Sequence, residues 1–320
     1  MSPGSPDDRP PVVVVTGPTA TGKTPLALEL ALRFGGEIVN ADSMQVFRFM
    51  DIGTAKPSAE QRAQVPHHML DVVTPDVPYS AGKYATAARA AAARVHARGH
   101  VPLLTGGTGL YIRAFLEGLI DSAEADPELR AELEAEHERA VAEGDPHRLH
   151  RRLADVDPET AERVHPNDVR RVTRALEIAA QRGEQSSRVR GAHGFRDRPY
   201  RVLHLALDME RETLNERIDR RCVQMIEAGL LQEVRGLLDR RYGPELRPMQ
   251  AIGYRHVVPV ALGSGTLELA LEGMQADTRR FARRQRTWLR AIPEVEAFDP
   301  REPAPIFERV ERFLEKGGSA

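Results

Sequence analysis

The sequence VVVVTGPTATGKT, at residues 12–24, carries the clearest signal of how the chain folds. The run of β-branched valines is typical of a buried strand in a parallel sheet. The residues that follow it fit G-x-x-x-x-G-K-[ST] at every fixed position, and an apolar helical pattern covers 25–34. A strand, a Gly-rich loop and a helix in this order predict a phosphate-binding loop, in which backbone N–H groups and the helix N-terminus bind an anion.

Further strand and helix signals alternate along the chain on both sides of a long helical region. Short apolar runs predict strands at 37–40, 101–105 and 202–207, and an Ala-rich stretch predicts a helix over 79–98. Alternating strands and helices indicate an α/β protein. We therefore predict a P-loop core with a doubly wound parallel sheet.

The charge pattern separates a second region from this core. Residues 115–162 carry 15 acidic side chains and five arginines, whereas residues 163–201 carry ten arginines and four acidic side chains. Helical patterns dominate the region. The predicted domains are a disordered tail (1–10), an α/β core (11–120 and 195–320) and a helical insertion (121–194).

Composition excludes several classes of protein. The chain has 320 residues, is 41% hydrophobic and carries a net charge of −2, as expected of a globular protein and not of a fibrous or disordered chain. No apolar run approaches the roughly 18 residues that span a bilayer. With Cys222 as its one cysteine, the chain is expected to be cytoplasmic and reduced. Only four of its 45 basic residues are lysines, so Lys23 stands out in a chain that otherwise uses arginine.

The predicted phosphate loop has a defined chemistry. Lys23 can reach the distal phosphate, and the Thr24 hydroxyl can bind Mg²⁺. The predicted diphosphate- or nucleotide-binding residues are Gly17, Pro18, Thr19, Ala20, Thr21, Gly22, Lys23 and Thr24.

Asp42 is the carboxylate predicted to act beside this loop. It follows the strand at 37–40, and the carboxyl ends of parallel strands meet at one edge of the sheet. A carboxylate at that edge can act as a general base or as a metal ligand. The strand at 101–105 lacks the terminal aspartate of many nucleotide hydrolases, for which Asp71 and Asp208 are weaker alternatives.

Motifs along residues 12–290 resemble those of the bacterial tRNA dimethylallyltransferases, also called tRNA isopentenyltransferases. They are GPTATGKT at 17–24, NADSMQVF at 40–47, MDIGTAKP at 50–57, PHHMLD at 66–71, YSAGKY at 79–84, PLLTGGTGLY at 102–111, DPELR at 126–130, HPNDVRRVTRALEI at 165–178, QAIGYR at 250–255 and RRQRTWLR at 283–290. Each motif alone is weak, but their consistent order makes the resemblance specific.

The resemblance implies transfer of a dimethylallyl group from dimethylallyl diphosphate to N6 of the adenosine 3′ of the anticodon, in tRNAs that read codons beginning with U. The loop would then hold the leaving diphosphate, with Mg²⁺ on Thr24. Lys23 and Thr24 would stabilise the charge that develops on the diphosphate, and Asp42 would accept the proton that leaves the amine. Arg217, with Arg221 as second choice, completes the predicted catalytic set.

The resemblance also implies that the helical insertion (121–194) binds tRNA, and it implies a set of tRNA contacts around a base flipped out of its stack. They are Asp42, Ser43, Met44, Gln45, Thr108, Arg130, Arg170, Arg171, Val172, Thr173, Arg174, Gln250, Gly253, Tyr254 and Arg255. The protein is expected to be a monomer with no membrane partner.

Three alternatives remain open from the sequence. An ATP-dependent small-molecule kinase would share the loop and the carboxylate, but it leaves the basic insertion unexplained. An adenylate isopentenyltransferase acting on free AMP or ATP would not need the insertion or the motif at 165–178. A non-enzymatic RNA-binding module would have no use for a phosphate loop.

Overall fold

The computed structural model describes residues 8–118, 126–182 and 198–315. The chain divides into two compact units, one formed by Met1–Leu116 with Arg198–Ala320 and the other by Glu117–Asp197. This division lies within a few residues of the domain boundaries expected from the charge pattern. We call the two units the core unit and the helical unit.

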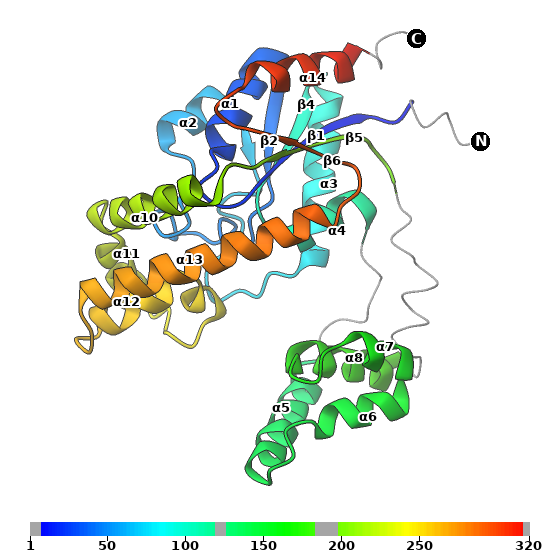
Figure 1. Cartoon of the computed structure of the whole chain (residues 1–320), viewed down its shortest axis with the longest axis vertical. Coiled ribbons are helices and arrows are strands. Elements are labelled where there is room, and N and C mark those ends of the chain that lie inside the picture. The colour runs from blue at the N-terminus through cyan, green and yellow to red at the C-terminus, as the bar shows by residue number, and fades with distance from the viewer. Residues whose placement is uncertain (1–7, 119–125, 183–197, 316–320) are drawn as a thin grey trace. The chain divides into compact units, whose positions relative to one another are not determined.

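The core unit contains a six-stranded sheet with the order β3-β2-β4-β1-β5-β6, and all neighbouring strands are parallel (Figure 1). The strands are β1 (Pro11–Thr16), β2 (Gly36–Asn40), β3 (His67–His68), β4 (Val101–Thr105), β5 (Arg201–Leu207) and β6 (Val295–Phe298). The predicted α/β class with a parallel sheet is confirmed.

Helices cover both faces of this sheet, because its strands are apolar on both sides. Val13 and Val15 of β1 belong to a core shared with α1 (Lys23–Phe34) and α14 (Ala304–Glu315). Val12 and Val14 belong to a second core, which includes residues of α3 (Ala81–Ala97) and α4 (Gly109–Glu117). Burial on both faces explains why β1 is a continuous run of valines.

Two strands were absent from the sequence prediction. Both β3 and β6 lie at edges of the sheet, and β3 has only two residues. β6 has four residues and pairs with β5. Segments this short carry too few residues to show a strand period.

The remaining helices of the core unit gather beside the carboxyl edge of the sheet, and α10 and α13 run side by side (Figure 1). They are α2 (Ala59–Gln64), α10 (Arg211–Glu227), α11 (Leu230–Asp239), the 3₁₀ turn η1 (Arg247–Gln250), α12 (Tyr254–Ala261) and α13 (Leu267–Arg290).

The helical unit has its own apolar core. Its described helices are α5 (Pro127–Ala142), α6 (Arg148–Val156), α7 (Pro158–Arg163) and α8 (Val169–Arg182). Leu133, Leu153 and Leu176 belong to the core between them. Asp126 caps α5 by accepting the N–H groups of Glu128 and Leu129 at 3.1 and 3.0 Å. Of the helices in the described ranges, none has the length and apolarity that a membrane span requires.

Glu37 on β2 is a buried carboxylate in an ionic cluster at the sheet. It is 2% exposed and accepts hydrogen bonds from Arg98 at 2.9 and 2.7 Å. Its oxygens also lie 2.6 Å from His68 Nε2 and 2.8 Å from His100 Nδ1. The Arg98 hydrogen bond is the main cause that lowers the pKa of Glu37 to about 2, against the opposing effect of burial.

This lowered pKa predicts a specific acid sensitivity. The contribution of Glu37 to the free energy of unfolding is fully present above its unfolded pKa of 4.5 and is lost as the pH falls toward about 2. Glu37→Gln is expected to lower the free energy of unfolding at pH 7 by about 1–3 kcal/mol. Urea unfolding from pH 6 to pH 2 checks this, because the wild-type curve should approach that of the variant below pH 4.5. A constant difference over that range would contradict the assignment.

Candidate active site

The loop at residues 17–24 has the backbone that its glycines predict. Gly17 has φ 145°, and a Cβ there would lie 2.6 Å from the carbonyl oxygen of Leu207. Gly22 has φ 95° and directly precedes α1, so Lys23 and Thr24 form its first turn. The Thr21 hydroxyl donates to the Pro18 carbonyl at 2.8 Å across the loop. The strand, loop and helix therefore follow one another as expected, and we call residues 17–24 the phosphate loop.

Lys23 lies across the phosphate loop. Its Nζ donates to the carbonyl oxygens of Gly17 at 2.9 Å and Pro18 at 2.7 Å. Burial and, after it, the positive charge of Arg221 lower its pKa to about 7, while the carboxylate of Asp42 acts in the opposite direction. A compact ammonium thus lies among loop carbonyls, with its charge state poised near neutral pH.

A cleft of about 1440 Å³ extends from the phosphate loop between the carboxyl edge of the sheet and the helices beside it. It brings together most of the predicted site residues of the core unit, which line it as follows: Thr19, Ala20, Gly22, Lys23, Thr24, Asp42, Ser43, Met44, Gln45, Thr108, Arg217, Arg221, Gln250, Tyr254 and Arg255. Gly17, Pro18 and Thr21 of the phosphate loop do not line the cleft, and Gly253 is buried where α12 begins.

Asp42 lies at the carboxyl end of β2, where the sequence placed it. Its Oδ1 accepts the N–H of Met44 at 2.8 Å and that of Gln45 at 3.4 Å, while Oδ2 accepts no hydrogen bond from the described residues. The Thr108 hydroxyl oxygen accepts the N–H of Ser43 at 2.9 Å. The turns that follow β2 and β4 are thereby joined, and one carboxylate oxygen remains available for chemistry.

Two arginines of α10 reach the phosphate loop from one face of the helix. Arg221 Nη1 donates to Thr19 Oγ1 at 3.3 Å, and burial lowers its pKa. Arg217 is exposed, with Nη2 lying 3.7 Å from the position that a Cβ on Gly22 would occupy. Arg221, the second choice from the sequence, therefore bonds the loop directly, and Arg217 flanks its other end.

Glu233 was missed by the sequence analysis and fixes one wall of the cleft. Its carboxylate accepts the N–H groups of Asp51, Ile52 and Gly53 at 2.8, 2.7 and 3.1 Å. The Tyr254 hydroxyl also donates to it, at 2.6 Å. Because the Tyr254 side chain is buried, its role here is to hold this wall. No local pattern marks Glu233, since its partners lie far away in the sequence.

Lys56, the second lysine within the motifs, has a structural role. It is almost completely buried, and its Nζ donates to Phe47 O at 2.6 Å, Asp51 Oδ1 at 2.8 Å and Asp71 Oδ1 at 2.7 Å. Asp71 is therefore committed to an ion pair. Asp208, the other alternative metal carboxylate, accepts from Arg286 Nε at 2.7 Å.

In the helical unit, the predicted RNA contacts divide into buried and exposed positions. Val172 and Thr173 are 1% and 4% exposed, so the prediction that they contact tRNA is wrong for their side chains, which pack inward. Arg130 and Arg174 each lie 2.8 Å from the buried carboxylate of Glu177. Burial alone would raise the pKa of Glu177, but hydrogen bonds from Arg174 and Arg130 outweigh it and lower the pKa. Arg170 and Arg171 are exposed on α8.

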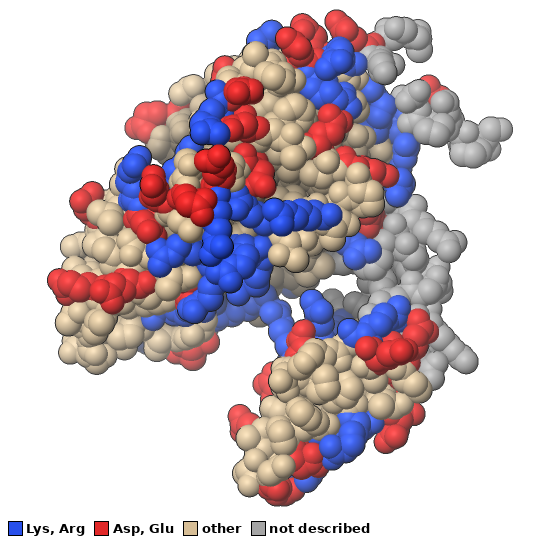
Figure 2. All heavy atoms as spheres, in the orientation of Figure 1, with Lys and Arg blue, Asp and Glu red and all other residues tan. Residues whose placement is uncertain are grey.

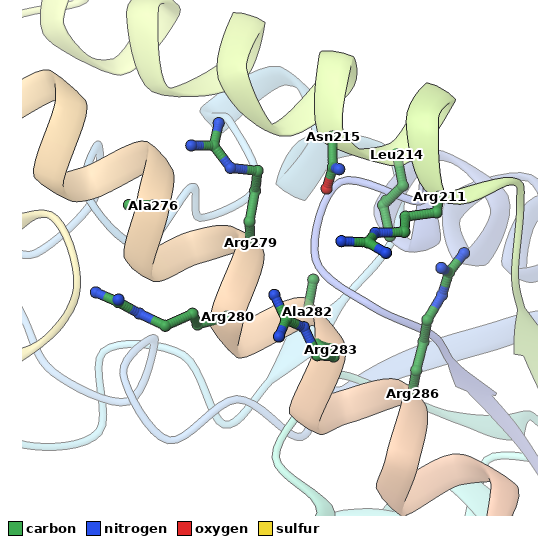
Figure 3. A pocket seen from close by; sticks show the side chains of 9 residues that line it. All are labelled: Arg211, Leu214, Asn215, Ala276, Arg279, Arg280, Ala282, Arg283 and Arg286. Carbon is green, nitrogen blue, oxygen red and sulfur yellow. The ribbon is translucent and has the colours of Figure 1, made fainter.

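A second, strongly basic cavity of about 450 Å³ lies between α10 and α13 (Figure 3). We call it the arginine cavity, and its lining is Arg211, Leu214, Asn215, Ala276, Arg279, Arg280, Ala282, Arg283 and Arg286. Arg279, Arg280 and Arg286 pair with Asp219, Asp277 and Asp208, respectively. Among the described residues, no acidic partner contacts Arg211 or Arg283. Figure 2 shows the resulting patch of basic side chains over the two helices.

The parallel sheet, the phosphate loop and the cleft that joins the loop to Asp42 define a P-loop-type α/β protein. The chain belongs to the IPP transferase family, because the profile of that family, described as IPP transferase, matches residues 45–292. A second profile, described as isopentenyl transferase, matches residues 10–71.

Named relatives and solved structures agree with this membership. The chain is 48% identical to a tRNA dimethylallyltransferase of Desulfatibacillum aliphaticivorans, over 95% of this chain and 98% of the relative. It is also 48% identical to one of Desulfosudis oleivorans, covering 97% and 98% of the two chains. The full-length tRNA isopentenylpyrophosphate transferase of Bacillus halodurans superposes with a TM-score of 0.70 at 37% identity, over 97% and 98% of the two chains. A eukaryotic dimethylallyltransferase acting on tRNA gives 0.78 at 30% identity, over 91% of this chain and 74% of that one.

Proposed function

We propose that this protein is a tRNA dimethylallyltransferase that moves a dimethylallyl group from dimethylallyl diphosphate to N6 of the adenosine 3′ of the anticodon, in tRNAs that read codons beginning with U. The observation that carries the proposal is the cleft, in which the phosphate loop, two arginines and Asp42 face one space. Near-full-length similarity to relatives with this name supports it.

On the donor side, the phosphate loop and the two arginines would stabilise the leaving diphosphate. When the allylic C–O bond breaks, negative charge grows on the diphosphate oxygens, and fixed donors aimed at that charge lower the barrier. Lys23, Arg217 and Arg221 supply three cations around the phosphate loop. Mg²⁺ commonly takes one or two protein ligands together with phosphate oxygens, so the Thr24 hydroxyl in the first turn of α1 fits the role of its protein ligand. When bound, the ion would neutralise part of the diphosphate charge.

On the acceptor side, Asp42 would remove the proton that the N6 amine loses as it attacks. Its Oδ1 is held by the N–H of Met44, so the carboxylate has a fixed direction, and Oδ2 is open to a substrate. Ser43 and Thr108, joined by their hydrogen bond, form the neighbouring wall against which a flipped base would lie. A single-stranded anticodon loop can present its adenine to such a pocket more easily than a duplex can.

The basic surfaces of both units would bind the tRNA backbone. The whole chain carries a net charge of −2, but residues 274–290 contain six arginines and one acidic residue. Much of this charge lines the arginine cavity, where Arg211 and Arg283 can neutralise phosphates without first breaking an ion pair. Arg170 and Arg171 offer a second exposed basic position on α8. Local charge of this kind governs RNA binding more than net charge does.

The direct test is incubation with labelled dimethylallyl diphosphate, Mg²⁺ and unmodified tRNA, with AMP, ATP and candidate metabolites as alternative acceptors in parallel. Label in tRNA at the adenosine 3′ of the anticodon is the expected result. Label in free AMP or ATP but not in tRNA would contradict the proposal and indicate an adenylate isopentenyltransferase. ATP turnover with a metabolite, without prenyl transfer, would indicate a kinase. We expect the active species to be a cytoplasmic monomer, and sedimentation with and without tRNA checks the oligomeric state.

Reversing the exposed arginines of α8 is expected to weaken tRNA binding. In Arg170→Glu/Arg171→Glu, the slope of log affinity against log salt should fall by about two, because each lost phosphate contact removes about one unit. Diphosphate binding should not change. Arg174 is left intact because it pairs with buried Glu177, so its reversal would disturb the fold of the helical unit.

Arg163→Glu serves as the matched control, since Arg163 pairs with Glu159 on α7 of the same unit. Filter binding across a salt series measures all variants. Unchanged tRNA affinity in the double variant would remove Arg170 and Arg171 from the interface.

A further inference from the structure

Gln285 of α13 is a buried polar side chain that connects two loops of the cleft. It is 6% exposed. Its Oε1 accepts the N–H of Thr19 at 2.9 Å, and its Nε2 donates to the carbonyl oxygen of Gly107 at 3.1 Å. Both ends of the amide are used, so reversing its orientation would break both bonds.

The Thr19 end of this link holds the first half of the phosphate loop. Thr19 is held on its other side by Arg221, whose Nη1 lies 3.3 Å from its hydroxyl oxygen. The next residue, Ala20, has φ 67°, a left-handed conformation that non-glycine residues adopt at a cost in energy. The surrounding contacts must therefore hold the loop in this shape, and Gln285 supplies one of them.

The Gly107 end of the link holds the turn that carries Thr108. This turn follows β4, and Thr108 accepts the N–H of Ser43 beside Asp42. The fit around Gly107 is close, since a Cβ there would lie 2.3 Å from Gln285 Nε2. Gln285 thus joins the loop expected to hold the diphosphate to the wall expected to hold the acceptor base.

The position of Gln285 on α13 places it between two surfaces. Met274, Thr278, Phe281, Arg284 and Gln285 line the cleft. Arg279, Arg280, Arg283 and Arg286 of the same helix line the arginine cavity (Figure 3). Four arginines of the helix therefore line the arginine cavity, while Gln285 and Arg284 line the cleft.

We propose that Gln285 is a positioning residue that holds the phosphate loop in register with the turn at residues 106–108. The donor carbon and the acceptor nitrogen are then kept at the separation that transfer requires, which small displacements disturb strongly. This inference rests on the proposed function, although the bracing of the loop can be measured without any transfer.

The principal experiment compares Gln285→Ala with Gln275→Ala. Gln275 is a matched control because it lies on the same helix and donates to a backbone carbonyl, that of Asp219, at 3.4 Å. In Gln285→Ala, calorimetry should show binding of inorganic diphosphate with Mg²⁺ weakened roughly 10-fold, since two backbone groups lose their buried partner. The KM for dimethylallyl diphosphate should rise and kcat should fall, while tRNA affinity stays at the wild-type value. Behaviour equal to that of Gln275→Ala would overturn the proposal.

A double-mutant cycle with Gly107→Ala provides a second test. The new methyl group must displace the Gln285 amide, so Gly107→Ala is expected to weaken diphosphate binding in the wild-type background and to have little further effect in Gln285→Ala. Full additivity would overturn the link. If Gln285→Ala does not fold, Gln285→Glu replaces it in the first experiment, because it keeps the acceptor for Thr19 and loses the donor to Gly107. It is then expected to weaken diphosphate binding, and wild-type affinity would overturn the proposal.

A wild-type protein that transfers no dimethylallyl group to tRNA overturns the proposed function, whatever the variants do. Diphosphate binding that is insensitive to Gln285 overturns the inference, whatever the wild type transfers.

Discussion

Replacing Asp42 by asparagine is expected to reduce kcat for transfer to tRNA by about 10³-fold, within the range that general bases contribute. Asparagine has the shape of aspartate and keeps an oxygen that can accept the N–H of Met44, so the turn after β2 should stay folded. It cannot accept the proton of the N6 amine. The tRNA affinity should stay largely intact, which single-turnover transfer and equilibrium tRNA binding measure separately.

Asp42→Ala separates the chemical role of the carboxylate from its structural role. The alanine variant loses the base together with the hydrogen bond to Met44, so its activity should be no higher than that of the asparagine variant and its stability lower. If both variants lose tRNA affinity and transfer to the same extent, Asp42 is a binding residue and the assignment as base is wrong. If the asparagine variant retains wild-type kcat, proton removal occurs elsewhere.

The parts of the site that lie close together in sequence could be predicted from it. The valines of β1, the loop glycines and the first turn of α1 are local features. In each of them the residue type suits the backbone conformation at its own position. The position of Asp42 was predictable for a different reason. In a parallel sheet every strand ends at the same edge, so a carboxylate just after β2 must lie near a loop just after β1, even though β4 lies between these two strands.

The supporting residues could not be predicted, because their partners are distant in the chain. Glu233 holds residues 51–53, and Gln285 holds Thr19 and Gly107, yet neither residue has an unusual local context. Whether such a polar side chain is buried and bonded cannot be predicted from its neighbours in sequence, because the fold brings its partners from distant parts of the chain. Resemblance to a family marked the motif that contains Gln285, but it did not indicate which side chain in it faces the phosphate loop.

The helical period of the sequence around Val172 and Thr173 could have corrected the prediction that this stretch contacts tRNA. Val172, Ala175 and Leu176 share one face of α8 at helical spacing, and that face is apolar. Applied to the motif at 165–178, this period would have assigned Val172 to the core of the helical unit and left Arg170 and Arg171 outside it. The ion pair between Arg130 and Glu177 had no comparable signal, because Arg130 lies on α5 and Glu177 lies on α8.

Replacing Lys23 by methionine is expected to weaken diphosphate binding by about 10³-fold, since a charge pair near 4 Å in a partly buried site is worth about 4 kcal/mol. Lys23→Arg should fail to restore binding, because a planar guanidinium cannot take the place of an ammonium that donates to both Gly17 and Pro18 within one loop. Calorimetry with inorganic diphosphate and Mg²⁺ measures both variants. Wild-type affinity in Lys23→Arg would show that any positive charge suffices at this position.

The lowered pKa of Lys23 predicts that this amine reacts unusually fast near neutral pH and that diphosphate binding depends on pH. With only four lysines in the chain, the reaction at each one can be measured. With a pKa of about 7, Lys23 is half neutral at pH 7, whereas an ordinary lysine has about one neutral amine in 10³. An acylating reagent at pH 7 should therefore label Lys23 ahead of exposed Lys83, and bound diphosphate should protect it by restoring its proton. Because the anion needs the protonated amine, diphosphate affinity should fall as the pH rises above 7. Labelling of Lys83 first, with no protection of Lys23, would show that Lys23 keeps its proton in the free protein.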